Sequence, residues 1–103
     1  MIIAFAISFE NGKFWLRGNL TANNATLVRK HFELIFQTQN EAILHLGALD
    51  KIDTASVFEI QKLLKFTNQR HLNLSITGTE NPKLKGKLPL NGMFFNLDYL
   101  QSA

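Results

Sequence analysis

The residues best suited to chemistry or binding stand together between an apolar run and a helical pattern. The run at residues 42–46 is apolar enough to be a buried strand, and residues 57–68 carry apolar side chains at helical spacing. Asp53 lies between them, where its carboxylate can cap the helix by accepting hydrogen bonds from free backbone N–H groups. Thr54 and Ser56 follow in the first turn, where those N–H groups and the helix dipole favour an anion.

Two capping patterns compete for the start of this helix. Asp53 is one candidate cap. The sequence Ser56-Val57-Phe58-Glu59 also fits a capping box, in which Ser56 and Glu59 each bond the backbone N–H of the other. Two helix starts about three residues apart therefore remain open.

Apolar side chains occupy two sides of this helix. One side would pack on a sheet, because at about 100° per residue its members form a single stripe. That stripe comprises Val57, Ile60, Leu63 and Leu64. Phe58, Lys62 and Phe66 share another side, at spacing i, i+4, i+8. Either a neighbouring segment of the chain covers these phenylalanines or a partner does, because exposed apolar patches mark contacts.

Catalysis finds little support in the sequence. The chain has no glycine-rich phosphate loop, no Gly-x-Ser-x-Gly elbow and no metal-spaced cluster of His, Asp and Glu. Asp50 and Asp53 stand three residues apart at a strand end, where catalytic carboxylates often lie. Asp53 already has a capping role, however, and neither has an evident base or metal partner. We expect no enzymatic activity, no cofactor and no metal site.

Length and composition indicate one globular domain. The chain has 103 residues, enough for one hydrophobic core, and we interpret residues 1–103 as a single domain. Hydrophobic residues make up 46% and charged residues 18%, which argues against disorder. The absence of cysteine rules out a disulfide framework and makes a cytoplasmic location the simplest interpretation. No run approaches the roughly 18 apolar residues of a membrane span, so we expect no transmembrane segment.

The charge of the chain is mildly positive. A net charge of +3 allows an acidic partner or a membrane surface, but it does not require nucleic acid. Lys83, Lys85 and Lys87 recur at every second position and are interpreted either as a solvated loop or as a docking site for an acidic protein or anionic lipid. The stretch lacks interleaved aromatic residues, so we do not expect nucleic-acid binding.

The remaining segments supply the elements that position Asp53. Two alternating segments flank Asn11-Gly12, a strong signal for a two-residue hairpin turn, so residues 3–9 and 13–18 are predicted to pair antiparallel. Apolar spacing predicts a helix over 22–38. Strands at 42–46 and 72–77 are separated by a helix and should run parallel. The expected remainder is a polar loop before Asp53, a helix start at Pro82, and a last strand or covering segment at 93–100.

This order of elements, with an Asp at the mouth of the second helix, resembles the STAS family. That family includes bacterial anti-sigma factor antagonists, the cytoplasmic domains of sulfate transporters, and a small subunit of the lipid-transport ABC system. The matching segments are Gly18-Asn19-Leu20-Thr21, Leu44-His45-Leu46 and Ile52-Asp53-Thr54-Ala55-Ser56-Val57. The family pattern at the last segment looks like Ile-Asp-Ser-Ser-Gly-Leu. The resemblance implies an α/β fold with a four- to five-stranded mixed β-sheet and helices packed on one side.

The resemblance also implies a protein-binding regulatory module without catalysis of its own. In the antagonists, a Ser or Thr at the second position after the Asp is phosphorylated by the partner kinase. Ala55 occupies that position here and has no hydroxyl, so phosphorylation at the usual site is excluded. Thr54 and Ser56 remain possible phosphorylation sites. The order Asp-Thr-Ala is similar to the lipid-transport subunit, whose Thr at the matching position contacts the ATPase.

Several positions depart from the family pattern. Ser56 replaces a Gly, His45 replaces an acidic residue in the central strand, and Thr21 replaces an acidic residue that closes the Gly-x-Leu motif. The final long helix of the family is reduced to about residues 97–103. These departures bear on the phosphorylation switch more than on the fold.

These patterns predict a docking face for a protein partner on the first turn and outer side of the second helix. The partner would be an anti-sigma factor with kinase activity or, alternatively, the ATPase of a lipid-transport ABC system. The sequence leaves the oligomeric state open. The predicted docking residues are Asp53, Thr54, Ala55, Ser56, Phe58, Lys62 and Phe66.

Overall fold

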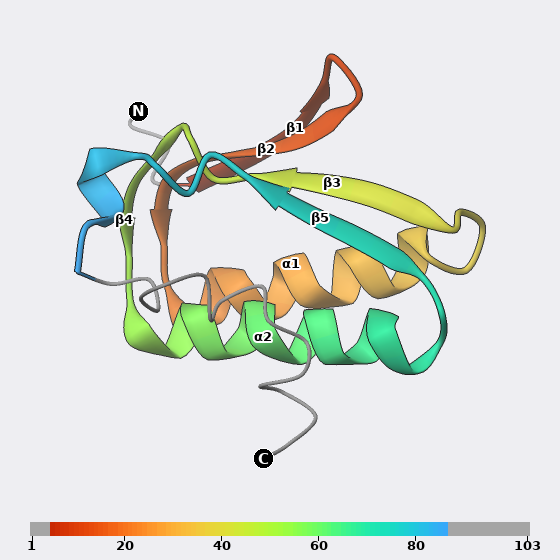
Figure 1. Cartoon of the computed structure of the whole chain (residues 1–103). Helices are drawn as coiled ribbons and strands as arrows, with labels where there is room; N and C mark the ends of the chain where they lie inside the picture. Colours follow the sequence, from red (N-terminus) through yellow and green to blue (C-terminus); the bar gives the residue numbers. More distant parts are fainter. Residues whose placement is uncertain (1–4, 87–103) are drawn as a thin grey trace.

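Five strands form one mixed sheet, and two helices cover one side of it (Figure 1). The computed structural model describes residues 5–86. The strands are β1 (Phe5–Glu10), β2 (Lys13–Leu20), β3 (Glu41–His45), β4 (Leu49–Ile52) and β5 (Asn73–Thr77). The helices are α1 (Ala22–Ile35), α2 (Thr54–Gln69) and the short 3-10 helix η1 (Pro82–Leu84). The predicted α/β fold with a mixed sheet is therefore confirmed.

The order of strands combines a hairpin with parallel crossovers. The sheet runs β1-β2-β3-β5, and β4 pairs with β2 off this path. β1 and β2 are antiparallel, and their turn has positive φ at both Asn11 (52°) and Gly12 (77°), as a two-residue hairpin turn requires. β3 and β5 are parallel neighbours, as the intervening helix predicted. The sequence therefore identified both pairings correctly.

The strand β4 corrects the prediction of a polar loop before Asp53. Its burial alternates irregularly, because Leu49 and Ile52 are buried while Asp50 and Lys51 are exposed. Gly18 of β2 pairs with Leu49, but the next residue of β2, Asn19, pairs with Lys51, so the register skips Asp50. This bulge turns two apolar residues three apart to the same side. A search for period-two alternation therefore misses the strand.

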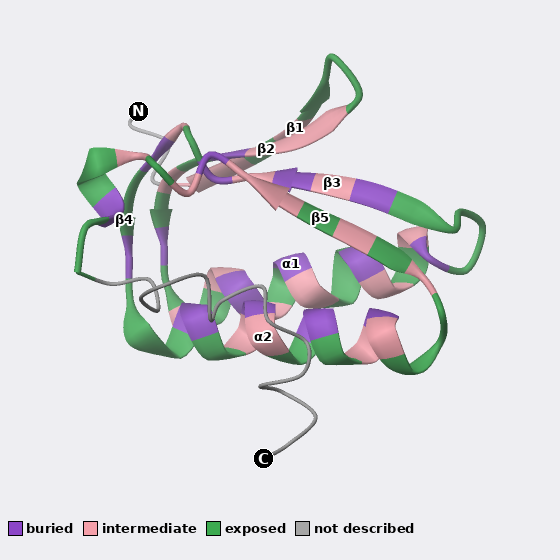
Figure 2. Ribbon diagram, in the orientation of Figure 1, coloured by how far each residue is buried: buried purple, intermediate pink, exposed green. Residues whose placement is uncertain are grey.

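The core lies between the sheet and the helices, and Figure 2 shows buried positions along the strands and on the side of the helices that faces the sheet. α1 contributes Ala25, Val28 and Phe32. α2 contributes the predicted stripe of Val57, Ile60, Leu63 and Leu64. From the sheet, Leu16 and Leu44 are fully buried. The helical spacing in the sequence therefore identified the inward face of both helices.

The opposite face of the sheet carries polar and aromatic side chains instead. His45 lies 4.2 Å from the ring of Trp15 between centroids, and its Nδ1 is 2.8 Å from Thr77 Oγ1. Gly78, at φ 77°, packs against the backbone of Gly47 and the His45 ring, a space that a Cβ would fill. His45 therefore has a structural role at the ends of β3 and β5.

The end of the described chain follows the prediction in part. η1 begins at Pro82, the predicted helix start, and Asn81 caps it by accepting a hydrogen bond from Lys83 N–H. Lys87 and the segments expected at 93–100 and 97–103 lie outside the described residues. Within residues 5–86, no helix has the length and apolar character needed to cross a bilayer.

Candidate functional site

Asp53 joins the starts of both long helices. It is the N-cap of α2, and its Oδ1 accepts a hydrogen bond of 2.8 Å from the Ser56 N–H. Its Oδ2 accepts one of 3.2 Å from the N–H of Ala22, the first residue of α1. One carboxylate therefore satisfies free N–H groups at two positive helix ends, which stabilises both. The Asp53 cap is confirmed, and the capping box starting at Ser56 is wrong.

Ser56 faces inward from the first turn of α2. Its side chain is fully buried, and its hydroxyl lies 2.9 Å from the Leu20 carbonyl oxygen and 2.6 Å from Asp53 Oδ1. The hydroxyl can donate its single proton to either acceptor, so it links the end of β2 to the cap. This placement removes Ser56 from the predicted docking face, because neither a partner nor a kinase reaches a buried hydroxyl. Ser56 therefore has a structural role.

Four of the predicted docking residues form an exposed surface on α2, which we name the α2 face. Phe58 is 58% exposed, which is unusual for a large aromatic side chain. The Lys62 ammonium lies beside it on the helix and is 3.3 Å from Glu59 Oε1. The α2 face comprises Thr54, Ala55, Phe58 and Lys62, with Asp53 at its edge.

Phe66 does not belong to the exposed surface. Its side chain is half-buried and packs against the core, and the Arg70 guanidinium lies 4.0 Å from its ring centroid. At about 100° per residue, Phe66 lies about 80° around the helix from Phe58, toward the side of Glu59. Glu59 faces α1, so Phe66 is turned toward the neighbouring helix. Phe66 therefore lies beside the α2 face rather than on it, and its docking role stays a prediction.

An ion pair fixes α2 beside α1. Arg29 Nε donates to Glu59 Oε2 at 2.7 Å, and Arg29 Nη1 donates to Glu33 Oε2 at 3.0 Å. The hydrogen bond from Arg29 holds the pKa of the Glu59 carboxyl below its ordinary value of 4.5, against the opposing effect of burial. The α2 face is thus carried on a helix fixed by a cap at its start and by an ion pair along its side.

Asp50 is paired with Lys83, one of the three alternating lysines. Asp50 Oδ1 accepts a hydrogen bond of 2.8 Å from Lys83 Nζ, while Asp53 bonds the helix starts. The two carboxylates that stand three apart in the sequence therefore have separate structural partners. Over residues 5–86, no group of three or more His, Cys, Asp and Glu side chains is arranged to hold a metal ion.

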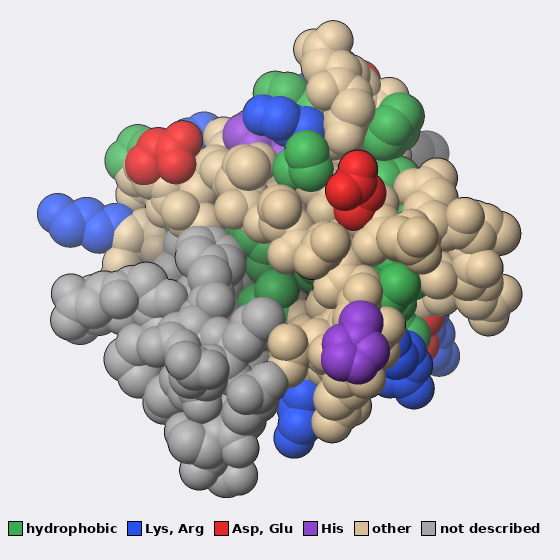
Figure 3. All heavy atoms as spheres, turned by 45° about the vertical axis from the view of Figure 1, so that its right-hand side comes forward, with side chains coloured by type: hydrophobic (Ala, Val, Ile, Leu, Met, Phe, Trp, Pro, Cys, Tyr) green, Lys and Arg blue, Asp and Glu red, His purple; other side chains and the backbone are tan. Residues whose placement is uncertain are grey.

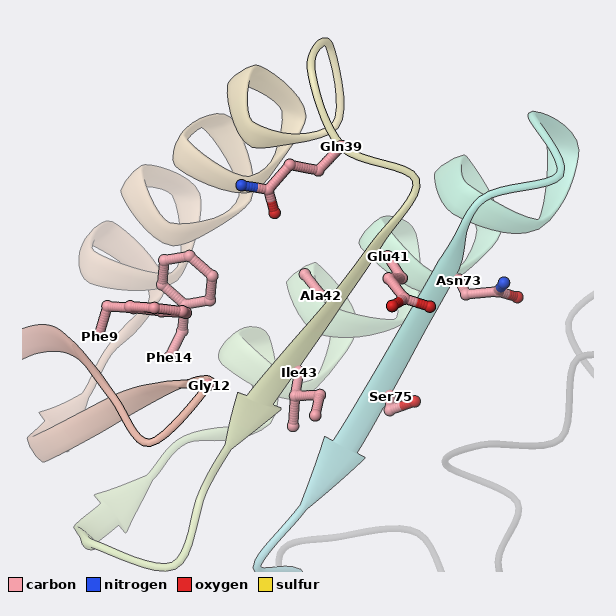
Figure 4. Close-up of a pocket in the computed structure, with 9 residues that line it drawn as sticks. All are labelled: Phe9, Gly12, Phe14, Gln39, Glu41, Ala42, Ile43, Asn73 and Ser75. Carbon is pink, nitrogen blue, oxygen red and sulfur yellow. The ribbon is translucent and has the colours of Figure 1, made fainter.

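Two hollows lie near these elements. One of about 420 Å³ lies at the start of α2 between Lys51, Asp53 and Lys83. The other, of about 260 Å³, lies where the hairpin diverges from β3 (Figure 4). β2 pairs with β3 at Leu44 and His45, which leaves the first half of β3 beside the hollow. Glu41 is the one acidic or basic side chain that lines it, so it lacks the paired groups that general acid–base chemistry needs.

Sequence reasoning missed four further exposed apolar side chains. Ile7, Phe9, Leu27 and Leu34 are exposed on β1 and α1, on different elements from the α2 face. A signal was present, because Leu27 and Leu34 are spaced i, i+7 and lie off the buried stripe of their helix. Figure 3 shows how apolar and charged side chains are interspersed on one face of the molecule.

Searches among protein-family models, curated proteins and solved structures find no match for this chain.

Proposed function

We propose that the chain is a non-enzymatic regulatory module that binds a protein partner through the α2 face. The observation that carries the proposal is Phe58, a large aromatic side chain 58% exposed on the second turn of α2. The Asp53 cap and the buried Ser56 hydroxyl hold that turn against the end of β2. An aromatic anchor on a fixed element loses little conformational entropy on binding.

The chemistry of the α2 face suits a partner with an apolar cleft and acidic surroundings. Phenylalanine supplies the buried contact, and aromatic anchors of this kind carry much of the energy of an interface. Lys62 supplies a positive charge beside it, with its side chain 65% exposed. A charge at the rim of an interface speeds association more than it raises affinity.

The STAS resemblance supports a module like an anti-sigma factor antagonist, whose partner would be an anti-sigma factor with kinase activity in the cytoplasm. Thr54 is exposed, and Ala55 stands at the usual phosphorylation position. A phosphate on Thr54 would add nearly two negative charges at the edge of the α2 face and block docking. Ala55 favours the alternative, a small subunit that constitutively supports the ATPase of a lipid-transport ABC system.

Capture of partners from the native cell tests the binding site. We expect the wild-type protein to retain a specific partner and the Phe58→Asp variant to lose it. Leu34→Asp is the matched control, because Leu34 is also an exposed apolar helical residue, on α1, and it should retain the partner. Equal capture by wild type and Phe58→Asp would contradict the proposal. Phe58 alone is replaced, because Phe66 packs on the core and its replacement would also destabilise the fold.

Intact mass before and after phosphatase treatment separates the two partners. Phosphate on the wild-type protein that disappears in Thr54→Ala favours the anti-sigma partner. Unmodified protein that co-purifies with an ATPase favours the ABC partner. Phosphate on Ser56 would contradict the structure, because that hydroxyl is buried between two acceptors.

A further inference from the structure

β5 is an edge strand whose outer backbone groups face no described strand. Among the described strands it pairs with β3 alone. The Asn73 N–H donates at 2.9 Å to the residue before β3, and the Thr77 carbonyl oxygen accepts at 2.8 Å from the residue after β3. Backbone groups alternate in direction along a strand, so those of Leu74 and Ile76 point away from β3. The N–H and C=O groups of these two residues therefore stand at the open edge.

The apolar core is open along the same edge. Leu74 and Ile76 pack against the core but are only partly buried, whereas the β3 residues paired with them, Ala42 and Leu44, are buried. Figure 2 shows intermediate and exposed positions along β5, where β3 has buried ones. A hollow of about 230 Å³ lies between β5 and α2, with Leu64 on the helix side. The apolar layer is therefore left open at β5.

This edge has the properties of a site for one more strand. Natural edge strands are often protected from pairing by charges or prolines, and β5 contains neither. An added strand would need apolar side chains on the face beside the hollow. Its other face would need polar side chains, because Asn73 and Ser75 are exposed on the helix-free side of the sheet. The edge therefore fits a strand with alternating apolar and polar residues.

The chain itself contains a segment with this pattern. It belongs to residues 87–103, which lie outside the described part of the chain. Its apolar positions recur with period two and are Met93, Phe95, Leu97 and Tyr99. Asn96 and Asp98 stand between them, and Asn91-Gly92 before them is a turn signal. Alternation of this kind predicts a strand with one buried face.

The connection to this segment is long enough and sets its direction. Asn81 bonds the Leu46 carbonyl oxygen just beyond β3, and Leu84 is buried, so η1 holds the chain at the end of the sheet where β5 ends. The chain from Gly86 to Met93 can extend roughly 23 Å at about 3.3 Å per residue. β5 has five residues and is about 17 Å long. A strand that starts here and follows β5 runs antiparallel to it.

We propose that residues 93–99 pair antiparallel with the open edge of β5 and cover the hollow beside α2 as a sixth strand. Their apolar face lies over Leu64 and Leu74, and their polar face joins Ser75 on the helix-free side. Leu64 lies about 120° around α2 from Phe58, on the side away from Glu59. The added strand therefore leaves the α2 face accessible.

A spin label tests the position of the segment directly. The chain has no cysteine, so Ser75→Cys, at an exposed position of β5, gives a single attachment site. We expect the label to broaden the amide NMR signals of residues 93–99 in dilute full-length protein. A label at Lys30→Cys, exposed on α1, is the matched control and should broaden them far less. Sharp signals beside the Ser75 label would overturn the proposal.

A mixed sample separates the chain's own segment from a second copy. Spin-labelled protein at natural isotope abundance is mixed with ¹⁵N-labelled protein that carries no spin label. We expect no broadening of residues 93–99 in the mixture, because the pairing is within one chain. Broadening there would assign the β5 edge to another copy and would also overturn the proposal.

Amide hydrogen exchange gives a second test with a matched pair of variants. The N–H groups of Leu74 and Ile76 should be protected in the wild-type full chain. Phe95→Asp should speed their exchange by about tenfold or more, because it places a charge against the core. Phe94→Asp is the control, because Phe94 is the adjacent residue on the opposite face, and it should leave both rates unchanged. The Leu44 amide of β3 should stay protected in both variants, which shows that the fold is intact.

Two exchange results would contradict the added strand. One is fast exchange of Leu74 and Ile76 in the wild-type protein, and the other is equal exchange in the two variants. Neither measurement involves Phe58, so partner capture by Phe58→Asp still decides the proposed function separately.

Discussion

Replacing Asp53 by alanine should destabilise the whole fold, because this carboxylate serves both long helices. The variant loses the Asp53 bond to the Ser56 N–H at the start of α2, and loss of an N-cap costs about 1 kcal/mol. It also loses the bond to the Ala22 N–H at the start of α1, and a hydrogen bond contributes about 1 kcal/mol net. We therefore expect the free energy of unfolding to fall by about 2 kcal/mol.

Urea denaturation followed by circular dichroism measures this change. For a domain of this size, about 2 kcal/mol corresponds to a fall in Tm of about 10 °C. Thr54→Ala is the matched control, since Thr54 is the exposed neighbour of Asp53, and its unfolding free energy should change by no more than about 0.5 kcal/mol. The reasoning would be refuted if Asp53→Ala were no more destabilising than Thr54→Ala.

Asp53→Asn separates capping from direct contact with a partner. Asparagine keeps a side-chain oxygen for the Ser56 N–H. Its NH2 group cannot accept the hydrogen bond from the Ala22 N–H, and the charge that interacts with two helix dipoles is lost, so we expect a cost of about 1–2 kcal/mol. If Asp53 acts by positioning the α2 face, the variant should keep most partner affinity while Phe58→Asp loses it. Complete loss of binding in a folded Asp53→Asn protein would show that the charge itself contacts the partner.

Three further changes test contacts at other places in the fold. Phe66→Ala should lower the free energy of unfolding by about 2 kcal/mol in urea titration, because Phe66 packs on the core. Glu59→Gln should remove about 1 kcal/mol at neutral pH. The hydrogen bond from Arg29 depresses the pKa of Glu59, so the stability from the ion pair is fully present above pH 4.5 and is lost as the pH falls through the lower pKa of the folded state. An acid titration of the Glu59→Gln variant should lack this loss of stability. Gly78→Ala should cost about 2–3 kcal/mol, because its positive φ and the Gly47 backbone leave no room for a Cβ; an unchanged Tm would contradict this.

The sequence by itself determined the local elements. Asn11-Gly12 specified the hairpin, because glycine and asparagine tolerate the positive φ angles of a two-residue turn. Helical spacing identified the inward stripes of α1 and α2, and Asp53 was one of two candidate caps for α2, of which the structure shows Asp53 to be the cap. Each of these features depends on residues within a few positions of one another, so a local pattern is sufficient to predict it.

The tertiary structure alone decided which of the predicted docking residues are exposed. Phe58 and Phe66 share a broad side of one helix in projection, but Phe66 lies toward α1 and packs on the core. Ser56 stands in the first turn with Thr54, but its side chain is fully buried and its hydroxyl lies 2.9 Å from the Leu20 carbonyl oxygen at the end of β2. Periodicity shows that a helix has an apolar side, and it cannot show which distant element covers that side.

Long-range packing also decided the strand β4 and the exposure of Leu27. Leu49 and Ile52 point inward together because of a bulge against Gly18, a feature set by the partner strand. Leu27 is exposed because the chain ends its sheet at β1 and places no further element beside that edge within residues 5–86. Burial depends on contacts between residues far apart in the sequence, and those contacts form only when the sheet and helices assemble.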